Sequence, residues 1–161
     1  MVQSFRPCAA NGHRLSNMTT KISIIPQSKR SGDLLSALLL LWEKSVRMSH
    51  HFLSDDDIAN LRPYVTEGLL CIETLIVASV NDAPVAFMGI QSDKIEMLFV
   101  APEHFRQGIG KRLIDMAIAD YYVRYVDVNG QNPDAAAFYV AMGFKAFERS
   151  ETDGQGNHFP I

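Results

Sequence analysis

Residues 96–112 read EMLFVAPEHFRQGIGKR, and this stretch gives the clearest indication of both fold and chemistry. Its apolar first part predicts a strand, and its end begins a helix after a loop that contains Gly108 and Gly110. Glycines let backbone N–H groups turn inward without obstruction by a side chain. The unpaired N–H groups of the first helical turn add the positive end of the helix dipole, and Lys111 and Arg112 add positive charge. The segment therefore predicts an anion site that suits a pyrophosphate.

Two known phosphate motifs can be tested against this loop. The P-loop needs a glycine where Phe105 stands, and Ser or Thr where Arg112 stands. The Rossmann fingerprint needs a third glycine where Leu113 stands, and its glycines follow the strand without an intervening Pro102. Asp127 lies near the distance expected for a ribose-binding acid, so the Rossmann alternative stays open at this point.

The pattern on either side of this stretch predicts alternating strands and helices. A short strand is expected before Pro26, and the helix after it starts at Ser31. Ser54 and Asp57 have the spacing of a capping box for a second helix, which Pro63 limits or kinks. Further strands are expected at residues 74–80, 85–90, 95–100, 122–128 and 144–147, and further helices at residues 110–122 and from Pro133 to Gly143. This order predicts an α/β protein with a mixed sheet and helices on both faces.

Composition limits the class of protein. The chain has 161 residues, a formal net charge of −3 and 47% apolar residues, which suits one globular domain. Mild acidity argues against a nucleic-acid-binding protein, and residues 34–42, the longest apolar run, are too few to span a membrane. With only Cys8 and Cys71, we expect reduced thiols in a cytoplasmic protein.

The two ends of the chain stand apart from this pattern. Residues 1–17 have no carboxylate and no apolar periodicity, so we expect a disordered tail or a start assigned too early, with Met18 as the true start. The single domain then covers residues 18–161. On this interpretation, deletion of residues 1–17 leaves stability and cofactor binding intact.

Two motifs of the sequence resemble those of the GNAT superfamily of N-acetyltransferases. The acetyl-CoA loop of that family, Gln/Arg-x-x-Gly-x-Gly/Ala, aligns with residues 105–110, where Phe105 departs from the pattern and Arg106 follows one place later. Further along, the family shows Asn-x-x-Ala, Phe-Tyr and Gly-Phe, and this sequence has Asn132 to Ala135, Phe138-Tyr139 and Gly143-Phe144. Residues 49–53 (SHHFL) resemble the small bacterial YjaB-like members.

The resemblance implies the acyl-CoA N-acyltransferase fold, with two splayed parallel strands, the family's fourth and fifth, at residues 95–100 and 122–128. Pantetheine lies between these strands in the family and pairs with the first of them. The cofactor-binding residues implied are Leu98, Phe99, Val100, Arg106, Gln107, Gly108, Ile109, Gly110, Lys111 and Asn132.

The same resemblance implies transfer of an acetyl group from acetyl-CoA, as co-substrate, to a primary amine of a small molecule or peptide. Tyr139 matches the family tyrosine that acts as general acid toward the sulfur of coenzyme A. Glu96 is the candidate base, acting through water, and His50, His51 and Phe52 lie where the family binds its acceptor. A catalytically idle acyl-CoA-binding module is the alternative.

We expect no metal, no nucleic acid and no membrane partner, and a monomer or homodimer. Two adjacent histidines point different ways on a helix, and the acidic residues 55–57 are explained as charges at a helix start. Family members usually continue their last strand beyond the position of residues 159–161. We therefore expect a short final strand here, which further residues or a partner chain complete.

Overall fold

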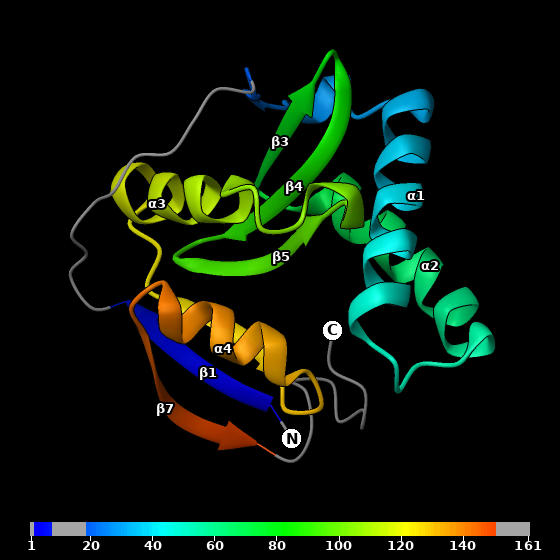
Figure 1. The fold of residues 1–161 in the computed structure, drawn as a ribbon. Coiled ribbons are helices and arrows are strands. Elements are labelled where there is room, and N and C mark those ends of the chain that lie inside the picture. The colour runs from blue at the N-terminus through cyan, green and yellow to red at the C-terminus, as the bar shows by residue number, and fades with distance from the viewer. Residues whose placement is uncertain (1, 8–18, 151–161) are drawn as a thin grey trace.

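The computed structural model describes residues 2–7 and 19–150, which form one mixed seven-stranded sheet flanked by helices (Figure 1). The strand order is β2-β3-β4-β5-β6-β1-β7, and only β5 and β6 run parallel among the paired strands described. The strands are β1 (Val2–Pro7), β2 (Lys21–Ile24), β3 (Thr74–Val80), β4 (Ala83–Gln91), β5 (Lys94–Val100), β6 (Tyr125–Asn129) and β7 (Phe144–Ser150). The predicted fold class, a mixed α/β sheet with helices on both faces, is confirmed.

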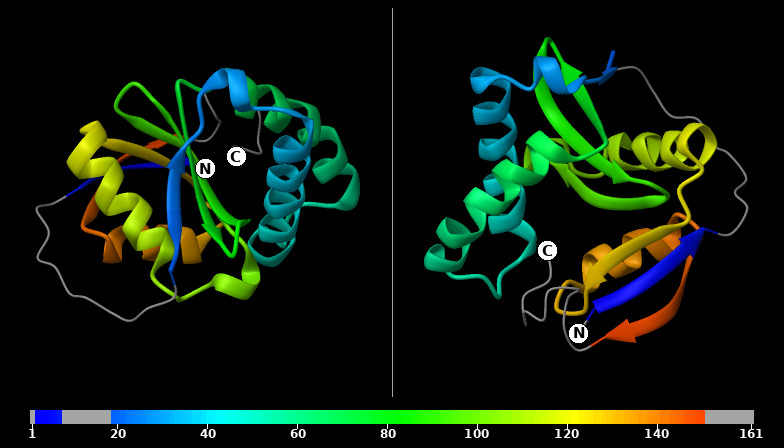
Figure 2. Two further views of the ribbon diagram at one scale, coloured as in Figure 1. Left: turned by 90° about the horizontal axis from the view of Figure 1, so that it is seen from above. Right: turned by 180° about the vertical axis from the view of Figure 1, so that it is seen from behind.

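Helices cover both faces of the sheet and enclose two apolar cores (Figure 2). α1 (Gly32–Ser49) and α2 (Asp55–Cys71) pack on one face around Trp42 and Phe87. α3 (Ile109–Tyr121) and α4 (Pro133–Ala141) pack on the other, around Leu113 and Phe144. Two single-turn 3-10 helices, η1 (Gln27–Lys29) and η2 (Pro102–His104), complete the described elements. None of the helices described has the length and apolar character needed to cross a membrane.

Local sequence signals set most element boundaries. Ser54 accepts a hydrogen bond from the Asp57 N–H, and the Asp57 side chain accepts one from the Ser54 N–H, so the predicted capping box is confirmed. Asn81 and Asp82 both have positive φ and join β3 to β4 in a two-residue hairpin turn.

Two boundaries differ from the sequence-based prediction. α2 runs eight residues past Pro63, because apolar residues on both sides of the proline, Ile58 and Leu69, are buried against the core. The strand expected from residue 122 begins only at Tyr125, because Tyr122 is the left-handed cap at the end of α3.

β5 and β6 diverge after a very short parallel ladder. They pair only at Lys94↔Tyr125 and Ile95↔Val126, and beyond these positions each strand follows its other neighbour. Figure 2, right, shows β6 (yellow) turning away from β5 (green). The splay expected between residues 95–100 and 122–128 is therefore present, and it places a gap in the sheet between β5 and β6.

The N-terminal segment departs from the expectation of a disordered tail. Val2–Pro7 form β1, which lies between β6 and β7 and runs antiparallel to both. Apolar periodicity fails as a signal here because the strand is defined by ladder partners more than 120 residues away. The remainder of the expected tail, and the short final strand expected at residues 159–161, lie outside the described residues.

Candidate active site

A cavity of about 740 Å³ occupies the gap between β5 and β6 and continues toward helices on both faces of the sheet. The C-terminal end of α1 contributes Ser45, Met48 and His50. The loop before α3 and the first turn of α3 contribute Arg106 and Gly110. Residues 95–100 of β5, residues 126–129 of β6, and α4 complete the walls. The cavity therefore lies between elements on both sides of the fork, the name used here for the point beyond Ile95 and Val126 where β5 and β6 part.

The loop before α3 lines this cavity and ends at a helix start whose first N–H groups have no acceptor within the helix. Gly108 has φ 79° and caps α3, and Arg106 has φ 60°, so the chain turns sharply twice before the helix. The bond from the Arg112 N–H to the Gly108 carbonyl is the first of the helix, at 3.0 Å, so the preceding N–H groups have no intrahelical acceptor. The loop and the helix start that the sequence predicts are both present, and this arrangement is one that can bind an anion.

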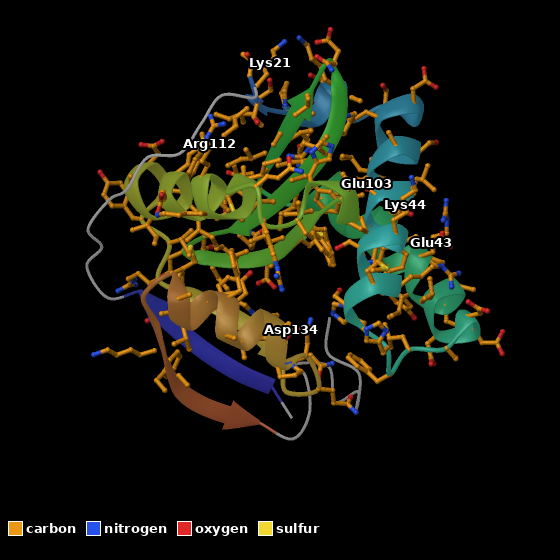
Figure 3. The ribbon with its side chains drawn as sticks, in the orientation of Figure 1. Lys21, Glu43, Lys44, Glu103, Arg112 and Asp134 are labelled. Carbon is orange, nitrogen blue, oxygen red and sulfur yellow. The ribbon has the colours of Figure 1, made fainter. Side chains whose placement is uncertain are left out.

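Gly110 is closely packed against α4. A Cβ at this position would lie 3.2 Å from Cζ of Phe138, so a side chain here would require the Phe138 ring to shift by a few tenths of an ångström. The other end of the loop makes an exposed ion pair with α1, in which Nζ of Lys44 lies 3.6 Å from Oε1 of Glu103 (Figure 3). The loop therefore has contacts with helices on both faces of the sheet.

Most of the residues expected to bind the cofactor line the cavity, but some of their side chains form hydrogen bonds or ion pairs within the protein instead. Gln107 does not line it: its amide donates to the Glu103 carbonyl and its Oε1 lies 3.1 Å from Nδ1 of His104. Lys111 lines the cavity while its Nζ bonds to Asp115 at 2.8 Å, so its charge is partly neutralised. The lining members are Leu98, Phe99, Val100, Arg106, Gly108, Ile109, Gly110, Lys111 and Asn132.

The backbone of residues 98–100 has one edge available to a ligand. These residues pair with β4 on one side, through Leu98↔Met88 and Val100↔Ala86. On the other side the ladder to β6 has already ended at Ile95. An extended ligand with amide groups can therefore add to this edge as a strand would.

α4 carries two of the predicted residues. Asn132 caps the helix by accepting from the Ala135 N–H at 3.1 Å, so its side-chain oxygen is committed to the fold. Tyr139 is 6% exposed, lines the cavity and stacks edge-on against Phe138 and Phe144. Burial raises the pKa of Tyr139, so the phenol keeps its proton at neutral pH and can donate it.

Glu96 reaches the cavity through an irregularity in β5. Gly89 pairs with Met97 and Ile90 with Ile95, so Glu96 is an extra residue in a β-bulge. Its side chain is 40% exposed, and Oε1 lies 3.2 Å from Nζ of Lys94. The bulge thus presents a carboxylate where the fork opens.

Of the three residues expected to bind an acceptor, only His50 lines the cavity. Its Nδ1 lies 2.8 Å from Oγ of Ser49, whose own proton is donated to the Ser45 carbonyl, so Nδ1 carries the proton and Nε2 is left as an acceptor. Burial, and then the nearby His51, lower the pKa of His50. His51 is exposed and Phe52 packs on the His50 ring, and neither lines the cavity.

Sequence reasoning considered Asp127 only as the ribose-binding acid of the Rossmann alternative, and it did not assign Asn129 to this site. Both lie on β6 and line the cavity, and Asp127 bonds to Ser4 and Lys94. Residues 126–129 all line the cavity, so the signal that could have found them is the strand that the sequence predicts at residues 122–128 beside the splay. Within the described residues no group of three or more His, Cys, Asp or Glu is placed to hold a metal ion.

Comparisons with known proteins agree with this geometry. Residues 72–146 match the family described as an acetyltransferase (GNAT) domain. The peptidyl-lysine N-acetyltransferase YjaB of Salmonella typhimurium strain LT2 is 36% identical over 124 residues, which are 77% of this chain and 86% of the relative. The peptidyl-lysine N-acetyltransferase YiaC of Escherichia coli is 29% identical over 75% of this chain and 82% of that protein.

Solved structures show the same fold. The solution structure of apo-form YjaB from Escherichia coli superposes with a TM-score of 0.76 at 30% identity, over 89% of this chain and 94% of that one. The PaiA N-acetyltransferase of Thermoplasma acidophilum, solved in complex with coenzyme A, gives a TM-score of 0.66 at 22% identity, over 85% and 94%. By sequence, by fold and by the glycine loop at the fork, the chain belongs to the GNAT family of N-acetyltransferases.

Proposed function

We propose that this enzyme transfers the acetyl group of acetyl-CoA to the side-chain amine of a lysine in a peptide or protein. The observation that supports it most is the single cavity that joins the unpaired N–H groups before α3 to the fork and to Tyr139. The relatives named as peptidyl-lysine N-acetyltransferases support the choice of acceptor. A cytoplasmic location and a monomeric or homodimeric state stay predictions.

For the cofactor, the residues present fit a pyrophosphate followed by an extended amide chain. The pyrophosphate would lie on the N–H groups between Arg106 and Lys111, which need no particular side chain, so Phe105 in place of Gln or Arg is tolerated. The pantetheine amides would pair with the open edge of β5 at Leu98 and Val100. Bound in this way, acetyl-CoA would have its thioester near the point where β5 and β6 part, in the cavity that Glu96 and Tyr139 line.

In the reaction, the amine nitrogen forms a bond to the acetyl carbon and the carbon–sulfur bond breaks. Glu96 takes the proton of the amine, directly or through a water, and the Tyr139 hydroxyl gives a proton to the departing thiolate of coenzyme A. Burial raises the pKa of Tyr139, so its hydroxyl is protonated before the reaction begins. In this proposal Nε2 of His50, a hydrogen-bond acceptor on the α1 side of the cavity, binds the lysine amine.

The test is release of coenzyme A with acetyl-CoA and a lysine-containing peptide. We expect Tyr139→Phe and Glu96→Gln each to lower kcat by about 100-fold or more, the usual contribution of a general acid or base, with little change in acetyl-CoA affinity. Tyr64→Phe and Glu67→Gln, on the exposed side of α2, are matched controls that keep full activity. Tight acetyl-CoA binding without turnover on any lysyl peptide would contradict the proposal and favour the idle module.

A further inference from the structure

Glu96, the candidate base, lies in a bulge of β5, where the regular pairing of the strand does not fix its side chain. Glu96 is the extra residue of the β5 bulge and its side chain is 40% exposed. A glutamate side chain has three rotatable bonds, and holding it in one conformation costs conformational entropy. A base that must receive a proton at a defined position therefore needs a second group to hold its carboxylate.

Lys94 supplies such a contact from the same strand. It stands at the first pair of the short β5–β6 ladder, opposite Tyr125. Its Nζ lies 3.2 Å from Oε1 of Glu96 and 2.6 Å from Oδ2 of Asp127 on β6. One ammonium group thus bridges the two strands at the point where they begin to part.

Asp127 is itself fixed from its other side. Its Oδ1 accepts a hydrogen bond from Oγ of Ser4 at 2.7 Å, and Ser4 is its ladder partner on β1. The chain of contacts therefore runs from β1 through β6 to the bulge of β5. Burial alone would lower the pKa of Lys94, but the bond to Asp127 and the charge of Glu96 raise it, so the ammonium stays charged at neutral pH.

We infer that Lys94 is a positioning residue that holds the Glu96 carboxylate at the fork, with Asp127 and Ser4 as its anchors. The inference rests on the proposed function, in which Glu96 accepts the proton of the amine. It makes the N-terminal strand, through Ser4, part of the support of the candidate base, although Ser4 lies 92 residues before Glu96 in sequence. An exposed ion pair contributes little to stability, so the expected effect lies in the rate of reaction.

The experiment is a double-mutant cycle on kcat with acetyl-CoA and a lysyl peptide. We expect Lys94→Met to lower kcat about 10- to 100-fold, as for a displacement of a reacting group by about 1 Å, while acetyl-CoA affinity stays within about 2-fold. Asp127→Asn lowers kcat less than Lys94→Met does, and Ser4→Ala lowers it less than Asp127→Asn does. Lys94→Arg, which keeps the charge, recovers most of the loss. In a Glu96→Gln background, Lys94→Met has no further effect.

The matched control is Arg124→Gln. Arg124 pairs with Asp93 at 2.7 Å, at the same end of the sheet, and has no contact with Glu96. We expect this variant to keep wild-type kcat. The inference is overturned if Glu96→Gln lowers kcat while Lys94→Met does not, or if Lys94→Met lowers it equally with and without Glu96. If the wild type transfers no acetyl group to any lysyl peptide, the proposed function fails first and the inference with it.

Discussion

His50 illustrates how a single residue at the site responds to its surroundings. Its Nδ1 is bonded to Ser49, and burial followed by the proximity of His51 lowers its pKa. The unfolded chain, with a histidine pKa near 6.5, binds a proton that the folded protein resists. The contribution of His50 to the free energy of unfolding is therefore fully present above about pH 6.5. It declines as the pH falls below that value toward the pKa of the folded state.

The prediction follows from this sign. The Tm of the wild type falls between pH 7.5 and pH 5.5, with a slope from this one group of at most about 1.4 kcal/mol per pH unit. His50→Gln makes the decline shallower, because the titrating group is gone. His51→Gln, at the exposed neighbouring position, leaves the decline nearly unchanged. Equal pH dependence of both variants, measured by thermal unfolding, would show that His50 is not the group responsible.

Single residues also show how far the sequence predicts the site. Gly108, Gly110 and Tyr139 follow from local motifs, because their roles depend on neighbours in the loop or helix. The contacts among Ser4, Lys94 and Asp127 depend on which strands lie side by side and in which register, and Ser4 and Asp127 are 123 positions apart. His51 was expected to bind the acceptor, but the end of α1 at Ser49 points only His50 into the cavity.

At the scale of elements, α2 ends against a buried arginine. Arg30 is 5% exposed, and its guanidinium donates to the carbonyls of Leu69 and Ile72 at 3.1 and 2.6 Å. The last carbonyls of a helix have no partner within the helix, so this side chain completes the C-terminus of α2. It also ties η1 to the start of β3, through a bond of 3.5 Å to the Glu73 carbonyl.

Removal of this guanidinium leaves buried acceptors without donors. We expect Arg30→Met to lower the free energy of unfolding by about 2–3 kcal/mol, the usual penalty for unsatisfied buried polar groups. Arg62→Met is the matched control, because Arg62 makes a partly exposed ion pair with Glu43 and its loss costs less than about 1 kcal/mol. Urea denaturation checks both values. A loss from Arg30→Met no larger than that of the control would contradict this assignment.

Elements also show where local rules are overridden. Pro63 predicts a helix that ends or kinks there, and α2 continues through it to Cys71. Ile58 and Val65 on either side of the proline are buried in the same core, so packing compensates for the missing N–H of the proline. By contrast, the capping box at Ser54, the hairpin at Asn81 and the cap at Gly143 were predictable, because each depends on a few adjacent residues.

At the scale of the whole molecule, β1 connects the last strand of the sheet, β7, to β6 and so to the rest of the sheet (Figure 1). β7 pairs with β1 and, in the described part of the chain, has no ladder with β6. The expectation that residues 1–17 are dispensable rests on their lack of apolar periodicity. This lack is uninformative here, because a six-residue strand flanked by two others is specified by its neighbours.

The position of β1 leads to the opposite prediction for a chain that lacks residues 1–17. Deletion removes the pairing of β1 with both neighbours, exposes the edges of β6 and β7, and takes away the Ser4 contact to Asp127. With about 1 kcal/mol net per lost hydrogen bond, we expect the Tm to fall by about 10 °C or more and the protein to aggregate more readily. A synthetic peptide of residues 1–8 added in trans restores part of the Tm in a concentration-dependent way, and a scrambled peptide does not. A truncated protein with unchanged Tm and full activity would show that the β6–β7 end of the sheet is stable without β1.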